Sequence, residues 1–372
     1  MTTPSPLDEY PIHQAPISLR YIDTSDRNAY DRCYFNAQGR NGDTFLITGL
    51  GVYPNLGVID AYASVKRGDR ISTVRASDAL PLDRTQAVGP FRIEVIEPLQ
   101  KLRLVCDGAA HGVGYDLTWE GSFPAVEEPR HIIRRNGRII VDACRFAQVG
   151  TWEGTLHVDG EDIAVTPDRW LGSRDRSWGI RPVGEAEPPG KPADPSVPQG
   201  FWWLYVPLRF DDYGIVVIAQ EEVDGTRTLN EAVRIWPAGS GTEVEPLGWP
   251  EVDITYRSGT RYVERAVIHL RAPGGKPLDI DVESLTGFPL NCGPGYGSDP
   301  EWSHGQWKGA GWVNGSSLSL TDPAVTPRLP FAMYDHAARA TCNGDVGYGL
   351  FEHSSVGRHD PSGFADFTSV AS

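Results

Sequence analysis

The chain has 372 residues, with 34 lysine and arginine residues against 49 aspartate and glutamate residues, so its formal net charge is −15. This charge disfavours nucleic acids and acidic membrane surfaces as partners, because both bind proteins chiefly through lysine and arginine. The apolar fraction of 40% is typical of a globular protein, and the length allows two domains or one large one.

Strand patterns recur along the whole chain. Short runs rich in β-branched residues end at glycine, proline, asparagine or aspartate, as strands joined by turns do. These runs are 45–48, 58–65, 91–96, 102–105, 138–141, 214–219 and 262–270. The sequence therefore predicts an all-β fold with mostly antiparallel strands, and only 330–339 has the pattern of a short helix.

A proline-rich segment divides the chain. Between Pro182 and Pro198 there are six prolines in 17 residues, a composition typical of a linker or an exposed crossover. We expect an N-terminal domain over 1–185, a linker over 186–199 and a C-terminal domain over 200–372.

The two halves share a sequence pattern. G-x-W-x-G-x-x-x-V-x-G-x-x-(I/L) begins at Gly150 and again at Gly305, at an offset of 155 residues. A weaker similarity relates 58–65 to 216–223. Both indicate a duplicated β domain. Sheets of that size hide their edges by closing into a barrel or by folding into a sandwich.

The aromatic run 201–210 is expected to be a strand with two covered faces. Alternation places Trp203, Tyr205 and Arg209 on one face and Trp202 on the other. One interpretation is a core face and an interdomain face. The other is that the face of Tyr205 lines an apolar cavity with a few polar groups, as in small-molecule sites.

The densest polar cluster lies at 172–181. As a strand, it would place Asp175 and Arg181 on one face and Arg174 and Trp178 on the other. If nearby guanidinium groups dominate, the pKa of Asp175 is lowered and the residue anchors an Arg–Asp network. If burial dominates, its pKa rises toward the working pH, as acid catalysis requires.

The octapeptide 174–181, R-D-R-S-W-G-I-R, with 150–154 and 347–352, resembles the R-D-x-S-W-G-x-R proteins of the AttH-like and hydroxyneurosporene synthase (carotenoid hydratase) superfamily. The resemblance covers roughly residues 30–355 and implies two tandem lipocalin-like β-barrels, in agreement with the duplication. It also implies chemistry on bulky apolar substrates without a redox cofactor, as in hydratases of carotenoids and prenylated phenolics. Arg176 stands where many relatives have a histidine.

Adding water to an isolated alkene, or removing it, requires a strong proton donor and aromatic faces that shelter a cation. We nominate Asp175 and Glu352 as the acids. The other candidates are Tyr205 and His304 for catalysis, and Trp178, Arg174, Arg181, Trp202, Trp203 and His353 for substrate binding.

Three function classes follow. The first is a cofactor-independent lyase, hydratase or isomerase for a hydrophobic terpenoid, steroid-like or aromatic compound. The second is a non-catalytic carrier of such a compound, and the third is a carbohydrate-active protein with tryptophan platforms. No metal site or cofactor is expected, because His353 and His359 lack a usable ligand spacing and no glycine-rich phosphate loop precedes a helix.

The N-terminus lacks the basic start and apolar core of a secretory signal, and no apolar run approaches the roughly 18 residues of a membrane span. We therefore expect a cytoplasmic protein whose partner is a hydrophobic small molecule rather than a nucleic acid or a membrane. The sequence does not decide whether the protein forms a homodimer. The five cysteines are expected to be buried small hydrophobic residues.

Overall fold

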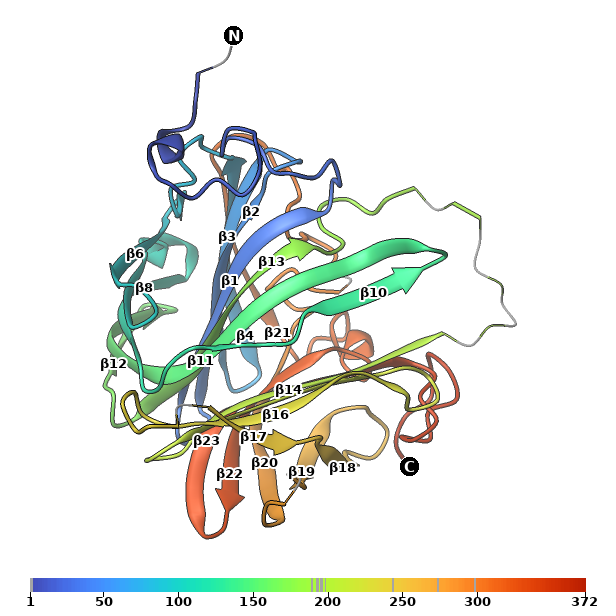
Figure 1. The fold of residues 1–372 in the computed structure, drawn as a ribbon. Coiled ribbons are helices and arrows are strands. Elements are labelled where there is room, and N and C mark those ends of the chain that lie inside the picture. Colours follow the sequence, from blue (N-terminus) through green and yellow to red (C-terminus); the bar gives the residue numbers. More distant parts are fainter. Residues whose placement is uncertain are drawn as a thin grey trace.

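The computed structural model describes residues 3–188, 190–191, 194, 197, 199–242, 244–272, 274–297 and 299–372. Several positions of the linker predicted over 186–199 lie outside the described residues. Two antiparallel sheets hold nearly all the regular structure described, and Figure 1 shows them stacked against each other, each strongly curled. The expected all-β fold of tandem lipocalin-like barrels is confirmed.

The first sheet has 14 strands. They are β1 (Ala29–Gly39), β2 (Thr44–Tyr53), β3 (Val58–Arg67), β4 (Arg70–Ala79), β5 (Ala87–Val88), β6 (Phe91–Glu97), β7 (Lys101–Cys106), β8 (Val113–Gly121), β9 (Val126–Glu127), β10 (His131–Arg135), β11 (Arg138–Val158), β12 (Glu161–Val165), β13 (Trp170–Ile180) and β21 (Trp312–Ser319). Its order is β21-β4-β3-β2-β1-β13-β11-β8-β7-β6-β5, and β9, β10 and β12 pair with β11.

The second sheet has nine strands. They are β14 (Gly200–Arg209), β15 (Gly214–Glu221), β16 (Arg227–Ile235), β17 (Val244–Gly248), β18 (Glu251–Tyr256), β19 (Val263–Leu270), β20 (Leu278–Pro289), β22 (Tyr334–Cys342) and β23 (Asp345–Gly357). Its order is β17-β16-β15-β14-β23-β22-β20-β19-β18. Three short 3₁₀ helices complete the described structure: η1 (Pro6–Glu9), η2 (Ala109–His111) and η3 (Thr326–Arg328). None of the described helices has the length and apolar character needed to cross a membrane.

All seven predicted strand runs fall on observed strands. The helix predicted over 330–339 is wrong, because Tyr334–Cys342 forms β22, which pairs with β20 on one side and β23 on the other. Backbone pairing and near-complete burial outweigh a helical period of barely two turns.

One strand from the second half of the chain belongs to the first sheet. β21 pairs with β4 from Trp312 opposite Ser77 to Ser319 opposite Arg70. The sequence pattern that begins at Gly150 runs through the end of β11 into β12, whereas its copy begins in a loop and continues into β21. The two copies therefore adopt different structures.

Buried apolar side chains form three main layers. One fills the interior of the first sheet, where the indole of Trp152 packs edge-on against Phe35 and Trp119 at centroid distances of 5.9 and 5.0 Å. Another fills the interior of the second sheet around Leu204 and Phe351. The third lies between the sheets. Because side chains alternate along a strand, β13 and β14 each contribute to an interior and to the layer between the sheets.

Candidate functional site

A cavity of about 350 Å³ lies in the layer between the two sheets. We call it the intersheet cavity. Its lining includes three carboxyl groups and three guanidinium groups, from Glu128, Asp175, Glu352, Arg32, Arg145 and Arg181, together with the imidazole of His131. Its aromatic lining comes from Tyr30, Tyr34, Phe201, Trp203 and Tyr296. A largely aromatic hollow of this size with a few converging polar groups is typical of small-molecule sites.

Strand register places the central polar groups in two facing rows. In the first sheet Tyr34 lies directly opposite Asp175. In the second, Glu352 lies directly opposite Tyr205 on one side and Asp335 on the other. Residues directly opposite each other in antiparallel strands share a face. The rows meet where the Tyr34 hydroxyl donates a 2.5 Å hydrogen bond to Asp335 Oδ2.

Arg145 connects the acids to the aromatic wall. Its Nε atom lies 2.6 Å from Glu128 Oε2. Its guanidinium group lies over the rings of Trp203 and Tyr205, 5.2 and 4.9 Å from their centroids. Burial opposes the charge of Arg145, but the nearby carboxylates raise its pKa above the usual value. Arg145 therefore remains charged and serves as the main counterion of the cavity.

Burial is the main influence on the acids of this cavity. It raises the pKa of Glu128 to about 7, against the opposing effect of Arg145. Burial also raises the pKa of Asp175 and of Glu352, and Arg145 again opposes it. The pKa of Asp335 is raised well above its usual value, first by burial and then by repulsion from Glu352. Burial therefore shifts the titration of all four carboxyl groups toward higher pH.

The two hypotheses for Asp175 can now be separated. Burial outweighs the guanidinium groups, so the expectation of a lowered pKa is wrong. The reason is geometric, because two of the expected neighbours point to the other face of β13. Arg174 donates to Gln148 at 2.8 Å, and Arg176 pairs with Asp31 at 2.8 Å.

A model of a family of unknown function (DUF8625) matches residues 5–365. The chain belongs to this family. Comparison with curated proteins found no match. The fold is similar to a putative AttH from Nitrosomonas europaea, with a TM-score of 0.50 and 14% identity over 88% of this chain and 92% of that chain. This likeness confirms the expected AttH-like fold.

Two other solved structures have a similar overall arrangement. One is kievitone hydratase from Nectria haematococca, with a TM-score of 0.49 and 16% identity over 95% of each chain. The other is CghA, with a TM-score of 0.48 and 12% identity over 90% of this chain and 89% of that chain.

The structure brings four predicted residues into the cavity lining: Asp175, Arg181, Trp203 and Glu352. The indole Nε1 of Trp203 donates a 2.7 Å hydrogen bond to Glu352 Oε1, which fixes the carboxyl group toward the first sheet. Tyr205 is fully buried beside Arg145. Among the described residues its hydroxyl has no hydrogen-bond partner.

His304 lies behind the cavity wall. Its ring packs edge-on against Tyr296 at a centroid distance of 4.6 Å, and Tyr296 is part of the cavity lining. Burial lowers the pKa of His304 well below its usual value, and the charges of Arg32 and Arg181 lower it further. The imidazole is therefore neutral, and it buttresses Tyr296 rather than facing the cavity.

Four residues predicted to bind substrate lie outside the cavity lining. Trp178 is 40% exposed and lies on the face of β13 opposite Asp175. Arg174 is buried beside Phe146, its guanidinium 5.2 Å from that ring centroid. Trp202 belongs to the interior of the second sheet.

His353, the fourth, supports β14 from behind. Its Nδ1 is hydrogen-bonded to the carbonyl oxygen of Trp203 at 2.7 Å, and its Nε2 to the hydroxyl of Tyr256 at 2.8 Å. Burial lowers the pKa of His353 to about 3, so the ring is neutral. It positions the strand that carries Trp203 but is not among the residues that line the cavity.

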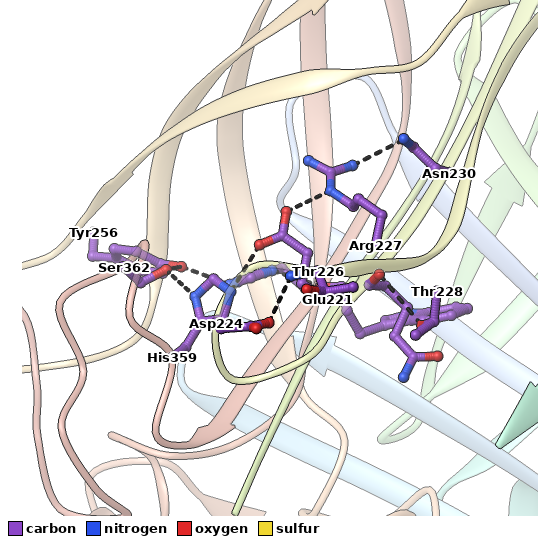
Figure 2. Close-up of polar contacts among 12 residues, drawn as sticks. Glu221, Asp224, Thr226, Arg227, Thr228, Asn230, Tyr256, His359 and Ser362 are labelled. Carbon is purple, nitrogen blue, oxygen red and sulfur yellow. Dashed lines mark hydrogen bonds and ion pairs between the residues drawn. The ribbon is translucent and has the colours of Figure 1, made fainter. Parts of the chain in front are cut away.

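A polar network holds Trp202 in place, and Figure 2 shows Glu221 between Arg227 and His359. The Glu221 carboxylate pairs with Arg227 Nε at 2.6 Å and with His359 Nε2 at 2.8 Å. His359 Nδ1 contacts Ser362 Oγ at 2.8 Å, and its ring stacks on Trp202 at 5.6 Å. Ser362, His359 and Glu221 form a hydrogen-bonded chain like that of a serine hydrolase. The ion pair of Glu221 with Arg227 and the stacking of His359 on Trp202 indicate that this chain has a structural role.

The sequence analysis missed Glu128, Arg145 and Asp335, and it also missed Arg32, Tyr34 and His131 of the cavity lining. Asp335 was hidden within the wrongly predicted helix. Glu128 follows the two-residue strand β9, which is too short to produce a pattern. Among the described residues, no three histidine, cysteine, aspartate or glutamate side chains are grouped so that they could hold a metal ion.

Proposed function

We propose that the protein is a cofactor-independent lyase, hydratase or isomerase acting on a hydrophobic terpenoid, steroid-like or aromatic molecule in the intersheet cavity. The observation that supports this most strongly is that Asp175 and Glu352 line the same aromatic cavity with pKa values raised by burial. Such an environment keeps a carboxylic acid protonated near neutral pH, where it can donate to carbon.

The surrounding charges suggest which acid donates. Four guanidinium groups, including Arg145 and Arg32, favour the ionised form of Asp175. Arg145, Arg181 and the hydrogen bond from Trp203 also favour the ionised form of Glu352, but the charge of Asp175 repels it. Glu352 is therefore assigned as the proton donor and Asp175 as the carboxylate base.

In hydration, the Glu352 carboxyl group transfers its proton to one alkene carbon, and positive charge develops on the other. A water molecule adds its oxygen to that carbon, and the Asp175 carboxylate accepts the proton that the water loses. Dehydration follows the same steps in reverse. In isomerisation no water adds, and the Asp175 carboxylate instead removes a proton from a carbon next to the cation, so that the double bond moves. The aromatic side chains of the cavity lining stabilise the cation.

The test begins with native mass spectrometry of the purified protein, to find a co-purifying apolar compound. Alkenes of the same class are then incubated with the protein in heavy-oxygen water. We expect label in the product. We also expect Glu352→Gln and Asp175→Asn to lower kcat by about 100-fold or more with ligand affinity retained, whereas the exposed-site control Asp162→Asn has no effect.

Two outcomes would contradict the proposal. Turnover that survives both Glu352→Gln and Asp175→Asn would remove these residues from the chemistry. A tightly bound compound that is recovered unchanged, with the same affinity in both variants, would instead support the non-catalytic carrier.

A further inference from the structure

A second cavity of about 350 Å³ opens at one end of the first sheet, next to its apolar interior. We call it the barrel mouth. Leu50 and Val52 of β2 form its floor, and Asp31 of β1 and Arg176 of β13 lie at its side. Residues of the N-terminal segment 7–22 close it from outside. Figure 1 shows this segment lying across the end of the first sheet.

The N-terminal segment is a structured cover. The Asp8 carboxylate accepts a 2.5 Å hydrogen bond from Ser18 Oγ and a 2.6 Å hydrogen bond from the Leu19 amide. These contacts lower the pKa of Asp8 to about 2. Ser5 Oγ donates to the carbonyl of Leu82 at 2.8 Å, which attaches the segment to the loop before β5.

The cover presents apolar side chains that the fold itself does not bury. Ile12 and Tyr21 are 50% and 52% exposed, and Leu7, Leu19 and Ile22 are only partly buried, yet all five line the barrel mouth. Apolar surface left around a hollow gains free energy when an apolar ligand removes it from water.

The lining of the barrel mouth has an excess of positive charge, which favours binding of an anion. Arg176 is already paired with Asp31 at 2.8 Å and also donates to Gln86. Arg84 makes no ion pair with any described residue, and its one described side-chain hydrogen bond is a long contact of 3.4 Å to the carbonyl of Leu19. Its backbone φ of 55° is unusual for a residue other than glycine, and such strained positions cluster at ligand sites.

We propose that the barrel mouth binds a second small molecule, an amphipathic anion. Its apolar part would pack against Leu50, Val52 and the N-terminal cover, and its carboxylate or sulfonate would pair with Arg84. The site is separate from the intersheet cavity, because alternate residues of the same strand face opposite ways. Arg176 faces the barrel mouth, whereas Asp175 faces the intersheet cavity.

The test uses fluorescence titration with 8-anilinonaphthalene-1-sulfonate, an apolar ring system with one negative charge. Ile22→Trp fills the barrel mouth, and Ile133→Trp is the matched control that fills the intersheet cavity. Both positions are partly buried, so both variants are expected to fold, which circular dichroism checks. The intersheet cavity is also aromatic and cationic, so the dye is expected to occupy two classes of site. We expect Ile22→Trp to weaken one class about tenfold or more and Ile133→Trp to weaken only the other. Two classes that Ile22→Trp leaves unchanged, or a single class that only Ile133→Trp weakens, would overturn the proposal.

A second arm tests the charge. Arg84→Asn removes the cation while keeping a residue that tolerates positive φ, and Arg84→Lys retains the charge. A charge-assisted hydrogen bond predicts a loss of about tenfold in Arg84→Asn and near-normal binding in Arg84→Lys. Decanoate should displace the dye and decanol should not. Equal competition by decanol, or an unaffected Arg84→Asn, would refute the preference for an anion. Neither arm depends on turnover, so failure here leaves the proposed function standing.

Discussion

Glu128→Gln tests the electrostatics of the intersheet cavity most cleanly. In the folded protein, burial raises the pKa of Glu128 from 4.5 to about 7. The folded state therefore binds more protons than the unfolded chain between pH 4.5 and 7, and stability falls as the pH rises through this interval. Each pH unit corresponds to about 1.4 kcal/mol, so Glu128 costs about 3 kcal/mol of stability above pH 7.

Glutamine cannot ionise, and its carbonyl oxygen can still accept the hydrogen bond from Arg145 Nε. We therefore expect Glu128→Gln to remove about 3 kcal/mol of the pH dependence of unfolding between pH 4 and 8. Urea unfolding at a series of pH values measures it, and the exposed neighbour Glu127→Gln is the control. Parallel curves for wild type and Glu128→Gln would refute the claim that this buried carboxyl titrates near neutrality.

Three further predictions concern the residues that shape the site. Tyr34→Phe leaves Asp335 without its 2.5 Å donor and should cost about 1–3 kcal/mol in denaturant unfolding, with an unchanged value refuting the contact. Gly179→Ala should cost more than about 2 kcal/mol, because a Cβ there would lie 2.0 Å from the Asp142 carbonyl oxygen at a φ of 134°, and normal thermal stability would contradict this geometry. Trp178→Ala should leave ligand binding in the intersheet cavity unchanged while Trp203→Ala weakens it. Calorimetry showing equal losses would contradict the placement of Trp203 in the cavity lining and of Trp178 on the face of β13 that points away from the cavity.

Alternation along single strands was sufficient to predict much of the site. It separated Trp203 and Tyr205 from Trp202 in β14, and Asp175 from Arg174 in β13. Each of these divisions matches the observed layers. A period of two residues is a local property of extended backbone, so it can be recognised without knowing which strands pair.

What remained hidden depends on contacts between segments far apart in the chain. Asp335 joins the site only because β22 pairs beside β23 and because Tyr34, 301 positions away, donates to it. The raised pKa of Asp175 could not be deduced from its sequence neighbours, because burial decided it. The strand exchange of β21 into the first sheet likewise follows from edge pairing, which no local pattern encodes.

The central claim is that the intersheet cavity keeps a protonated carboxyl group beside ionised ones at neutral pH. Infrared difference spectroscopy in heavy water measures the carboxylic acid carbonyl band directly. We predict a band at pH 7 that weakens in Glu352→Gln and in Asp335→Asn and persists in the exposed control Asp162→Asn. A spectrum at pH 7 without a protonated carboxyl band, or a band that is unchanged in both cavity variants, would contradict the account.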